Sequence, residues 1–230
     1  MNKFQLIYKK LYSLYGPQGW WPLLDLGDVN HKKGDKNYGG YHPDDYGFPK
    51  TDQQVFEICT GAILTQNTAW NNVVRALDNL KRRKALSPDV IIEMPPGKLA
   101  SIIKSSGYHN QKAKKLKAFA EFYVSLNGKV PSREELLQLW GIGRETADSM
   151  LLYAYKVPVF VVDAYTRRIF SKLRLIREKG DYDGIRAKFE NNIPKDLAVY
   201  QEYHALIVEH AKRHYSRKPY GASCPLLNRL

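Results

Sequence analysis

Two short amphipathic segments meet at Leu139-Trp140-Gly141-Ile142-Gly143, and this junction constrains the fold more than any other stretch of the chain. Glycine adopts positive φ angles and lets two backbones approach closely. The sequence therefore predicts a tight hairpin between two helices over residues 132–155. We expect the backbone amides of the hairpin and of the next helix start to bind an anion, such as a DNA phosphate.

Helical periodicity dominates the rest of the chain. Apolar residues at three- and four-residue spacing predict further helices, including segments at 3–15, 111–127, 164–173 and 196–214. Thr51 with Gln54, and Ser132 with Glu135, are capping-box patterns that mark helix starts. No stretch alternates with period two for long enough to indicate a sheet. We expect an all-α fold of about ten helices, with a long polar loop over residues 27–50.

The chain is strongly basic, with 36 Lys and Arg against 23 Asp and Glu, a net charge of +13 over 230 residues. Such a surplus indicates a polyanionic partner, nucleic acid or an anionic membrane surface, although a basic protein without one is the simpler alternative. The two cysteines, Cys59 and Cys224, exclude a disulfide framework and a four-cysteine metal site. No apolar run is long enough to cross a membrane. We expect a cytoplasmic protein.

A carboxylate follows the hairpin at Val162-Asp163, at a predicted helix start. Aspartate there is a good N-cap. The hairpin, the spacing to Asp163 and the net charge together resemble the helix-hairpin-helix (HhH-GPD) superfamily of DNA glycosylases, of the endonuclease III type, over roughly residues 50–215. That family has an L-P-G-V-G-like hairpin followed by V-D. The resemblance implies that Asp163 is the catalytic aspartate, which would stabilise an oxocarbenium-like state.

The resemblance also implies the domain organisation. We expect a nucleoid-associated monomer of two helical lobes, with a cleft between them that binds double-stranded DNA. Both ends of the chain would form one lobe, from residues 1–50 plus 175–230. The other lobe, residues 51–174, would be a helical barrel that contains the helix-hairpin-helix at 132–155.

Glu145 sits where the lyase branch of the family carries a Schiff-base lysine. A carboxylate cannot form an imine with C1′, so the match implies a monofunctional glycosylase with weak or no lyase activity. Glu145 is the second catalytic candidate beside Asp163. The alternative is an exposed first-turn glutamate that stabilises the helix dipole.

The C-terminal segment departs from the family members that bind an iron–sulfur cluster. Those carry four cysteines, whereas this segment has only Cys224 after Arg217-Lys218-Pro219. We expect no iron–sulfur cluster and no other metal cofactor, with a monovalent cation at the hairpin as the one candidate ion. Lys218 or another C-terminal lysine is a candidate to replace the structural work of the cluster.

Other motifs are similar to those of cluster-less bacterial 3-methyladenine DNA glycosylases. They are Trp20-Trp21-Pro22, Phe56-Glu57, the residues Gly61 through Thr68, and Gly107 through Leu116. A base pocket formed by Trp20, Trp21 and Phe56 would favour a cationic alkylpurine, because aromatic faces attract cations. The alternative is that these three aromatic residues only pack the core.

A DNA interface completes the prediction. Gln66 would fill the gap left by a flipped base, and Tyr108 would intercalate from the opposite side. Either residue could equally lie on a surface loop. The further candidate DNA contacts are Asn67, Gly141, Ile142, Gly143, Arg144, Thr146, Arg167 and Lys218.

These observations predict a monofunctional DNA glycosylase of base excision repair that releases an alkylated purine such as 3-methyladenine. One alternative is a mismatch glycosylase that removes uracil or thymine opposite guanine, with Asn67 reading the pyrimidine edge. Others are a non-catalytic DNA-binding module that has kept the hairpin, and an RNA-binding helical protein.

Overall fold

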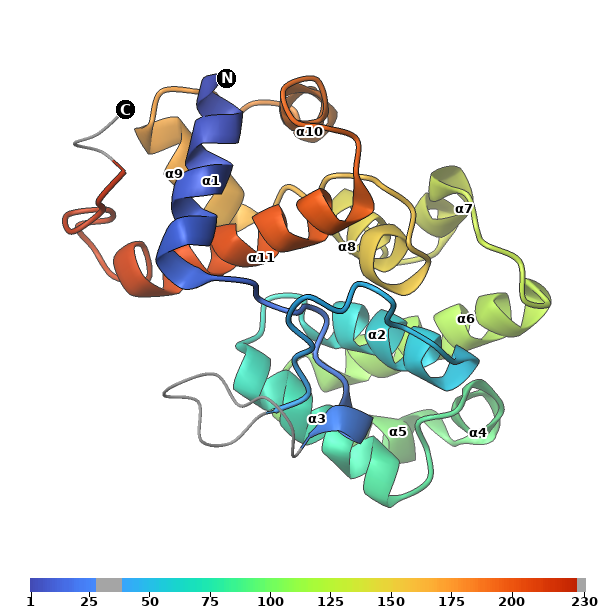
Figure 1. Ribbon diagram of the computed structural model, residues 1–230. Helices are drawn as coiled ribbons and strands as arrows, with labels where there is room; N and C mark the ends of the chain where they lie inside the picture. Colours follow the sequence, from blue (N-terminus) through green and yellow to red (C-terminus); the bar gives the residue numbers. More distant parts are fainter. Residues whose placement is uncertain (28–38, 227–230) are drawn as a thin grey trace. The chain divides into compact units, whose positions relative to one another are not determined.

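The computed structural model describes residues 1–27 and 39–226, so much of the predicted loop at 27–50 lies outside the described residues. Within those two ranges the chain forms helices and connecting segments without a β-strand, which confirms the all-α class. The chain divides into two compact units (Figure 1). Unit 1 comprises Met1–Trp20, His42–Tyr46 and Val157–Leu230, and unit 2 comprises Trp21–Tyr41 and Gly47–Lys156.

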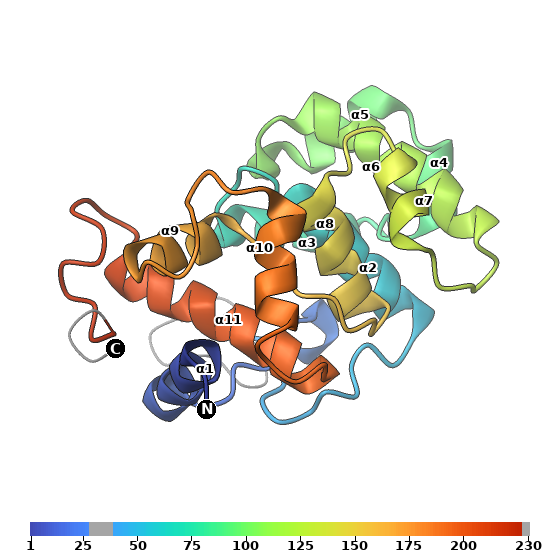
Figure 2. The same ribbon diagram turned by 90° about the horizontal axis from the view of Figure 1, so that it is seen from above.

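Unit 1 is built from the two ends of the chain. Its helices are α1 (Lys3–Tyr15), α9 (Ala164–Lys172), α10 (Tyr182–Glu190) and α11 (Leu197–His214). Helices α1 and α9 both pack on α11, and the blue and red ribbons of α1 and α11 lie together in Figures 1 and 2. The apolar stripe of α1 is buried in this packing through Phe4, Ile7 and Leu11.

Aromatic rings hold unit 1 together. Phe4 contacts Phe170 and Phe189 at 5.7 and 5.0 Å between ring centroids. Phe160 stacks on Phe189 at 4.2 Å. The Tyr203 hydroxyl donates to the backbone carbonyl of Phe4 at 2.9 Å, so α11 is fixed to α1 by a buried polar contact as well. Residues 29 to 199 positions apart in sequence therefore share one core, which ties the chain ends into a single unit.

Unit 2 contains the remaining elements. They are η1 (Leu24–Leu26), α2 (Asp52–Leu64), α3 (Trp70–Arg82), α4 (Pro88–Glu93), α5 (Pro96–Ile102), η2 (Lys104–Ser106), α6 (His109–Ser125), α7 (Arg133–Gln138), α8 (Arg144–Ser149) and the π-helical turn η3 (Met150–Ala154). Helix α2 is buried on nearly all sides, as its uniformly apolar sequence predicts. It packs against α3, α6 and η3.

The two predicted capping boxes have different outcomes. Ser132 and Glu135 form the complete box, with Ser132 N donating to Glu135 Oε2 at 2.7 Å and Glu135 N donating to Ser132 Oγ at 3.2 Å. Thr51 Oγ1 accepts from Gln54 N, but the Gln54 side chain accepts from Lys50 N instead of from Thr51. Thr51 therefore caps α2 alone, because Gln54 reaches one residue further back.

The unit boundaries differ from the predicted lobes of 1–50 plus 175–230 and 51–174. Residues 21–41 and 47–50 belong to unit 2, and residues 157–174 belong to unit 1. The physical reason lies in α9, whose Phe170 packs into the aromatic core of unit 1 against Phe4 and Phe189. Unit 1 contains segments from both ends of the chain.

One buried carboxylate ties the N-terminal part of unit 2 to α2. Glu57 is 3% exposed, and its Oε1 accepts from the backbone amide of Leu24 at 2.7 Å. Burial raises the pKa of Glu57 to about 7 against the opposing effect of that hydrogen bond.

The substitution Glu57→Gln should change how stability depends on pH. Between pH 4.5 and 7 the folded protein holds a proton on Glu57 that the unfolded chain has released, so this group's stabilising contribution falls as pH rises. The loss amounts to at most about 3 kcal/mol. Urea unfolding at pH 4.5 and at pH 7 measures this change in the free energy of unfolding. E57Q should not lose stability between the two pH values. The control Glu93→Gln, at an exposed position on α4, should lose as much as the wild type. If the stability of E57Q fell with pH as much as that of the wild type, Glu57 would not be the group responsible.

Candidate active site and nucleic-acid interface

The predicted hairpin is present in unit 2, between α7 and α8. Gly141 has φ +81°, and a Cβ atom on it would lie 2.4 Å from Cε of Lys115. The left-handed backbone favours glycine at this position, and a side chain here would also displace that of Lys115. Gly143, at φ −94°, is the extended N-cap of α8, and Ile142 between the two glycines is buried.

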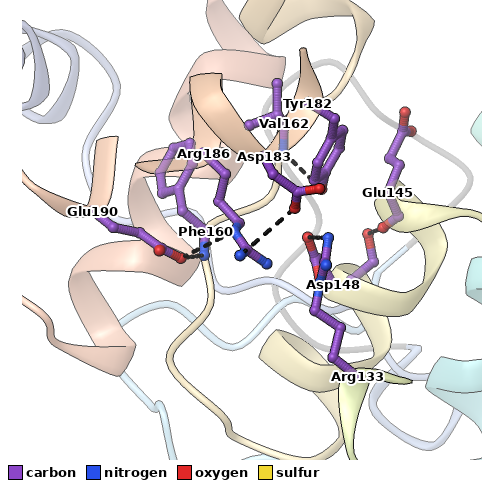
Figure 3. Close-up of polar contacts among 10 residues, drawn as sticks. Arg133, Glu145, Asp148, Phe160, Val162, Tyr182, Asp183, Arg186 and Glu190 are labelled. Atoms are coloured by element: carbon purple, nitrogen blue, oxygen red, sulfur yellow. Dashed lines mark hydrogen bonds and ion pairs between the residues drawn. The ribbon is translucent and has the colours of Figure 1, made fainter. Parts of the chain in front are cut away.

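A buried ion pair closes the hairpin. Arg133 of α7 donates from Nε to Asp148 Oδ1 at 2.6 Å and from Nη2 to Oδ2 at 3.2 Å. Figure 3 shows this two-pronged contact between the guanidinium and the carboxylate. The Asp148 side chain is fully buried and that of Arg133 is 17% exposed. The pair fixes the start of α7 to the end of α8, so the loop between them is held from its base.

Glu145 lies in the first turn of α8 with an exposed side chain. Its backbone carbonyl accepts from Ser149 Oγ at 2.7 Å, a contact also drawn in Figure 3. The neighbouring Arg144 is exposed as well, whereas Thr146 is buried. The sequence-predicted residues on this turn therefore divide into two exposed charges and one buried hydroxyl.

Three hydrogen bonds hold the Gln66 side chain, two to the hairpin and one to Lys115 of α6. Its Oε1 accepts from Lys115 Nζ at 2.5 Å, and its Nε2 donates to Gly141 O at 3.1 Å and to Thr146 Oγ1 at 2.9 Å. The structure thus brings together three residues that the sequence predicts as DNA contacts. An extended wedge conformation of Gln66 would require these bonds to break.

Lys112 fixes the two loops beside the hairpin. Its Nζ is buried and donates to Leu64 O at 2.7 Å, to Thr68 Oγ1 at 2.9 Å and to Ser106 O at 2.7 Å. Burial and the charge of Lys115 lower the pKa of Lys112 to about 8. These bonds hold the ends of the loops that carry Gln66 and Tyr108.

A hollow of about 340 Å³ lies next to this network. Two exposed aromatic residues border it, Tyr108 (71% exposed) and Trp140 (57% exposed). Asn67 lines it too, and both Asn67 and Tyr108 have left-handed backbones, with φ +51° and +46°. Our sequence reasoning missed Trp140. The signal was present, since this hairpin has tryptophan where the family's L-P-G-V-G pattern has proline.

Two of the three predicted base-pocket residues lie in the core of unit 2. Trp21 makes edge contacts with Trp70 and Tyr153, each at 5.3 Å between centroids. Phe56 is 1% exposed and packs against Phe119 and Tyr123 at 6.1 and 5.1 Å. This packing lends no support to a base-stacking role for Phe56.

In unit 1 an extended segment, residues 157–162, leads into Asp163. Its backbone amides donate to side chains of α10, from Phe160 N to Glu190 Oε1 at 2.9 Å and from Val162 N to the Tyr182 hydroxyl at 3.3 Å (Figure 3). Because α10 holds these amides, the position of the Asp163 backbone is fixed before the helix begins.

Asp163 is the N-cap of α9, as predicted. Its Oδ1 accepts from Thr166 N at 2.6 Å and from Thr166 Oγ1 at 2.7 Å. The other oxygen, Oδ2, lies 3.8 Å from His204 Nε2. One carboxylate oxygen therefore serves the helix while the other faces a histidine, and the side chain remains 13% exposed.

His204 of α11 is the second residue that our sequence reasoning missed. Its side chain is 6% exposed, and burial lowers its pKa, while the charge of Asp163 acts in the opposite direction. The ring of Trp20 meets the imidazole edge-on, with 5.8 Å between centroids. The pairing joins positions 41 residues apart, and no local pattern marks it in the sequence.

Two predicted DNA contacts lie elsewhere in unit 1. Arg167 donates from Nη1 to Gly180 O at 2.7 Å and to Glu178 O at 3.2 Å, which secures the segment before α10. Lys218 is exposed on the C-terminal segment. Arg168 donates to Tyr215 O at 2.7 Å and lies 4.1 Å from the Tyr220 ring centroid, so an arginine helps fix this segment.

Comparison with known proteins decides the family. The profile described as HhH-GPD superfamily base excision DNA repair protein matches residues 60–195, which include the hairpin and Asp163. This chain belongs to the HhH-GPD superfamily of DNA glycosylases. The resemblance that the hairpin and Asp163 suggested is thereby confirmed, and DNA is the partner of this family of repair proteins.

Relatives match nearly the whole chain. A candidate DNA repair glycosylase of Methanocaldococcus jannaschii, MJ1434, is 41% identical over 98% of this chain and 96% of its own length. The structure of H. pylori 3-methyladenine DNA glycosylase (MagIII) bound to 1,N6-ethenoadenine has 29% identity and a TM-score of 0.69, and covers 93% of this chain and 98% of that one. An endonuclease III–DNA complex shares the fold, with 22% identity, a TM-score of 0.71, and coverage of 99% and 95%.

The described residues contain neither a candidate membrane span nor a candidate metal site. None of the helices there is long and apolar enough to cross a membrane. Across residues 1–27 and 39–226, no group of three or more His, Cys, Asp or Glu side chains is placed to hold a metal ion.

Substituting Asp148→Asn should strongly destabilise the protein. The change removes the negative charge that the Arg133 guanidinium faces, and breaking a buried ion pair in this way costs about 3–5 kcal/mol. Urea unfolding measures this free energy. The matched control is Asp78→Asn on α3, whose ion pair with Arg82 is solvent-exposed and contributes about 0.5 kcal/mol. Equal losses in both variants would refute a structural role for the hairpin pair.

Proposed function

We propose that this protein is a monofunctional DNA glycosylase that releases alkylated purines, such as 3-methyladenine, from duplex DNA and leaves an abasic site. The observation that carries the proposal is the arrangement around His204, where the carboxylate of Asp163 and the ring of Trp20 both contact one buried side chain. The candidate catalytic carboxylate and a candidate base-stacking ring thus belong to one site in unit 1.

The chemistry assigned to Asp163 is stabilisation of positive charge. Cleavage of the bond between C1′ and the base nitrogen leaves an oxocarbenium-like sugar, and a carboxylate lowers the energy of that state. Water then adds to C1′ and loses its proton. The N-cap bonds to Thr166 orient the carboxylate in advance, so little reorganisation is needed during the reaction.

The residue types favour a cationic substrate. An N-alkylated purine carries a formal positive charge and departs as a neutral base, so it needs no general acid. The face of Trp20 would add about 0.5–2 kcal/mol of cation–π attraction. The similarity to MagIII over nearly the full length of both chains supports the same substrate class.

Glu145 supports hydrolysis without strand cleavage. Its side chain is exposed in the first turn of α8, where the lyase branch of the family carries an amine, and a carboxylate cannot form an imine. The product would therefore be an intact strand with an abasic site.

Base release from a panel of duplexes tests the proposal. The panel holds 3-methyladenine, 7-methylguanine, hypoxanthine, and uracil and thymine opposite guanine. We expect release of alkylpurine, with strand breaks only after alkali, and a loss of at least about 100-fold in Asp163→Asn, since a neutral amide cannot offset the developing charge. Asn keeps the cap of α9, so D163N should retain its fold and its duplex affinity.

Other outcomes separate the alternatives. Release of only uracil or thymine would keep the glycosylase and overturn the alkylpurine assignment. Duplex binding without base release, in both the wild type and D163N, would indicate a DNA-binding module. Tighter binding to RNA than to lesion-bearing duplex DNA would indicate an RNA-binding protein. The binding assays need a fixed salt concentration, because each neutralised phosphate changes log K by about 0.9 per log unit of salt.

The substitution Glu145→Lys should create a trappable amine. If position 145 faces C1′ of the lesion, a lysine there forms an imine with an abasic site, which borohydride reduces to a stable protein–DNA adduct. Arg144→Lys, one position earlier on the same exposed turn, is the matched control and should give little adduct. Equal trapping in the two variants, or none in E145K, would show that Glu145 does not face C1′.

A further inference from the structure

His204 is placed to act on Asp163. Both residues are in unit 1, His204 in α11 and Asp163 at the start of α9, and these two helices pack against each other. The distance of 3.8 Å between His204 Nε2 and Asp163 Oδ2 exceeds that of a hydrogen bond. The contact is therefore close enough for a strong electrostatic effect but does not lock the carboxylate.

The surroundings of His204 favour its neutral form. The side chain is buried, and Trp20 presents an uncharged ring to it. Asp163 is the charged group whose field acts on the imidazole. Glu202, two residues earlier in α11, is turned toward the backbone amides of Gln18 and Gly19, at 2.8 and 3.1 Å. From α1, Tyr8 packs on Tyr203 and brings an uncharged hydroxyl.

A proton on His204 would change what Asp163 can do. An imidazolium at this distance, shielded from water, would pair with the carboxylate. The paired carboxylate would offer less stabilisation to an oxocarbenium-like sugar, because part of its field is already neutralised. The neutral and the protonated form of His204 thus correspond to an active and an inactive carboxylate.

We propose that His204 is a positioning residue for Asp163, whose uncharged imidazole leaves the carboxylate available for catalysis and whose protonation shuts base release down. The proposal rests on the function proposed above. It adds a control element outside the hairpin, and it assigns a role to a residue 41 positions away from the aspartate.

The coupling can be tested without a substrate, by following the histidine ring signals in NMR from pH 4 to 8. Asp163→Asn removes the negative charge that faces His204, so its titration should move to lower pH. His210, also buried in α11, is the internal control, because its ring contacts Tyr15 and Cys224 and not Asp163. A His204 titration that D163N leaves unchanged, or a ring that stays neutral down to pH 4 in both proteins, would overturn the proposal.

The catalytic consequence is tested by pH–rate profiles for base release. His204→Gln places an amide near the position of Nε2 and cannot gain a charge. We expect H204Q to keep at least about one third of the wild-type rate at pH 7.5 and to exceed the wild type about threefold at pH 5. His210→Gln, a matched change on the same helix, should keep the shape of the wild-type profile.

The NMR titration and the pH–rate profiles together distinguish a failure of this proposal from a failure of the proposed function. An H204Q profile parallel to those of wild type and H210Q would overturn the role of His204 while base release itself stands. Absence of base release from every duplex in the wild type would overturn the proposed function, and the NMR titration would still decide whether Asp163 controls the charge of His204.

Discussion

The geometry of the hairpin depends on one buried ion pair. Arg133 and Asp148 join the first residue of α7 to the end of α8, and with that base fixed, Gly141 can pass within contact distance of Lys115. Lys115 in turn holds Gln66, whose amide returns to the hairpin through Gly141 and Thr146. A single closed network thus connects the hairpin, α6 and the loop after α2, and the exposed rings of Tyr108 and Trp140 stand beside it.

Unit 1 is held together by different contacts. Its framework is an aromatic core shared by both ends of the chain, and α10 holds the segment before Asp163 through backbone amides. The candidate catalytic side chain is placed by its own helix, because Asp163 caps α9. Rigid placement of a carboxylate suits a reaction in which charge develops at a fixed point.

Local signals predicted much of this fold. The glycine hairpin, the Ser132–Glu135 box and the Asp163 cap all depend on residues within a few positions of one another, so sequence spacing reveals them. The contacts that sequence reasoning missed join distant positions: His204 with Asp163, Lys112 with Leu64, and Phe56 with Phe119. Even a short-range pattern can mislead. The Gln54 side chain accepts from the backbone amide of Lys50 and not from that of Thr51.

The cap of α9 has a consequence for how this protein could change over time. Oδ1 of Asp163 serves the helix, and an asparagine oxygen would serve it equally well. Selection for folding alone therefore cannot distinguish the acid from the amide at this position. At this position, a repair enzyme and an inactive DNA-binding protein would differ by one side-chain atom, an amide nitrogen in place of a carboxylate oxygen.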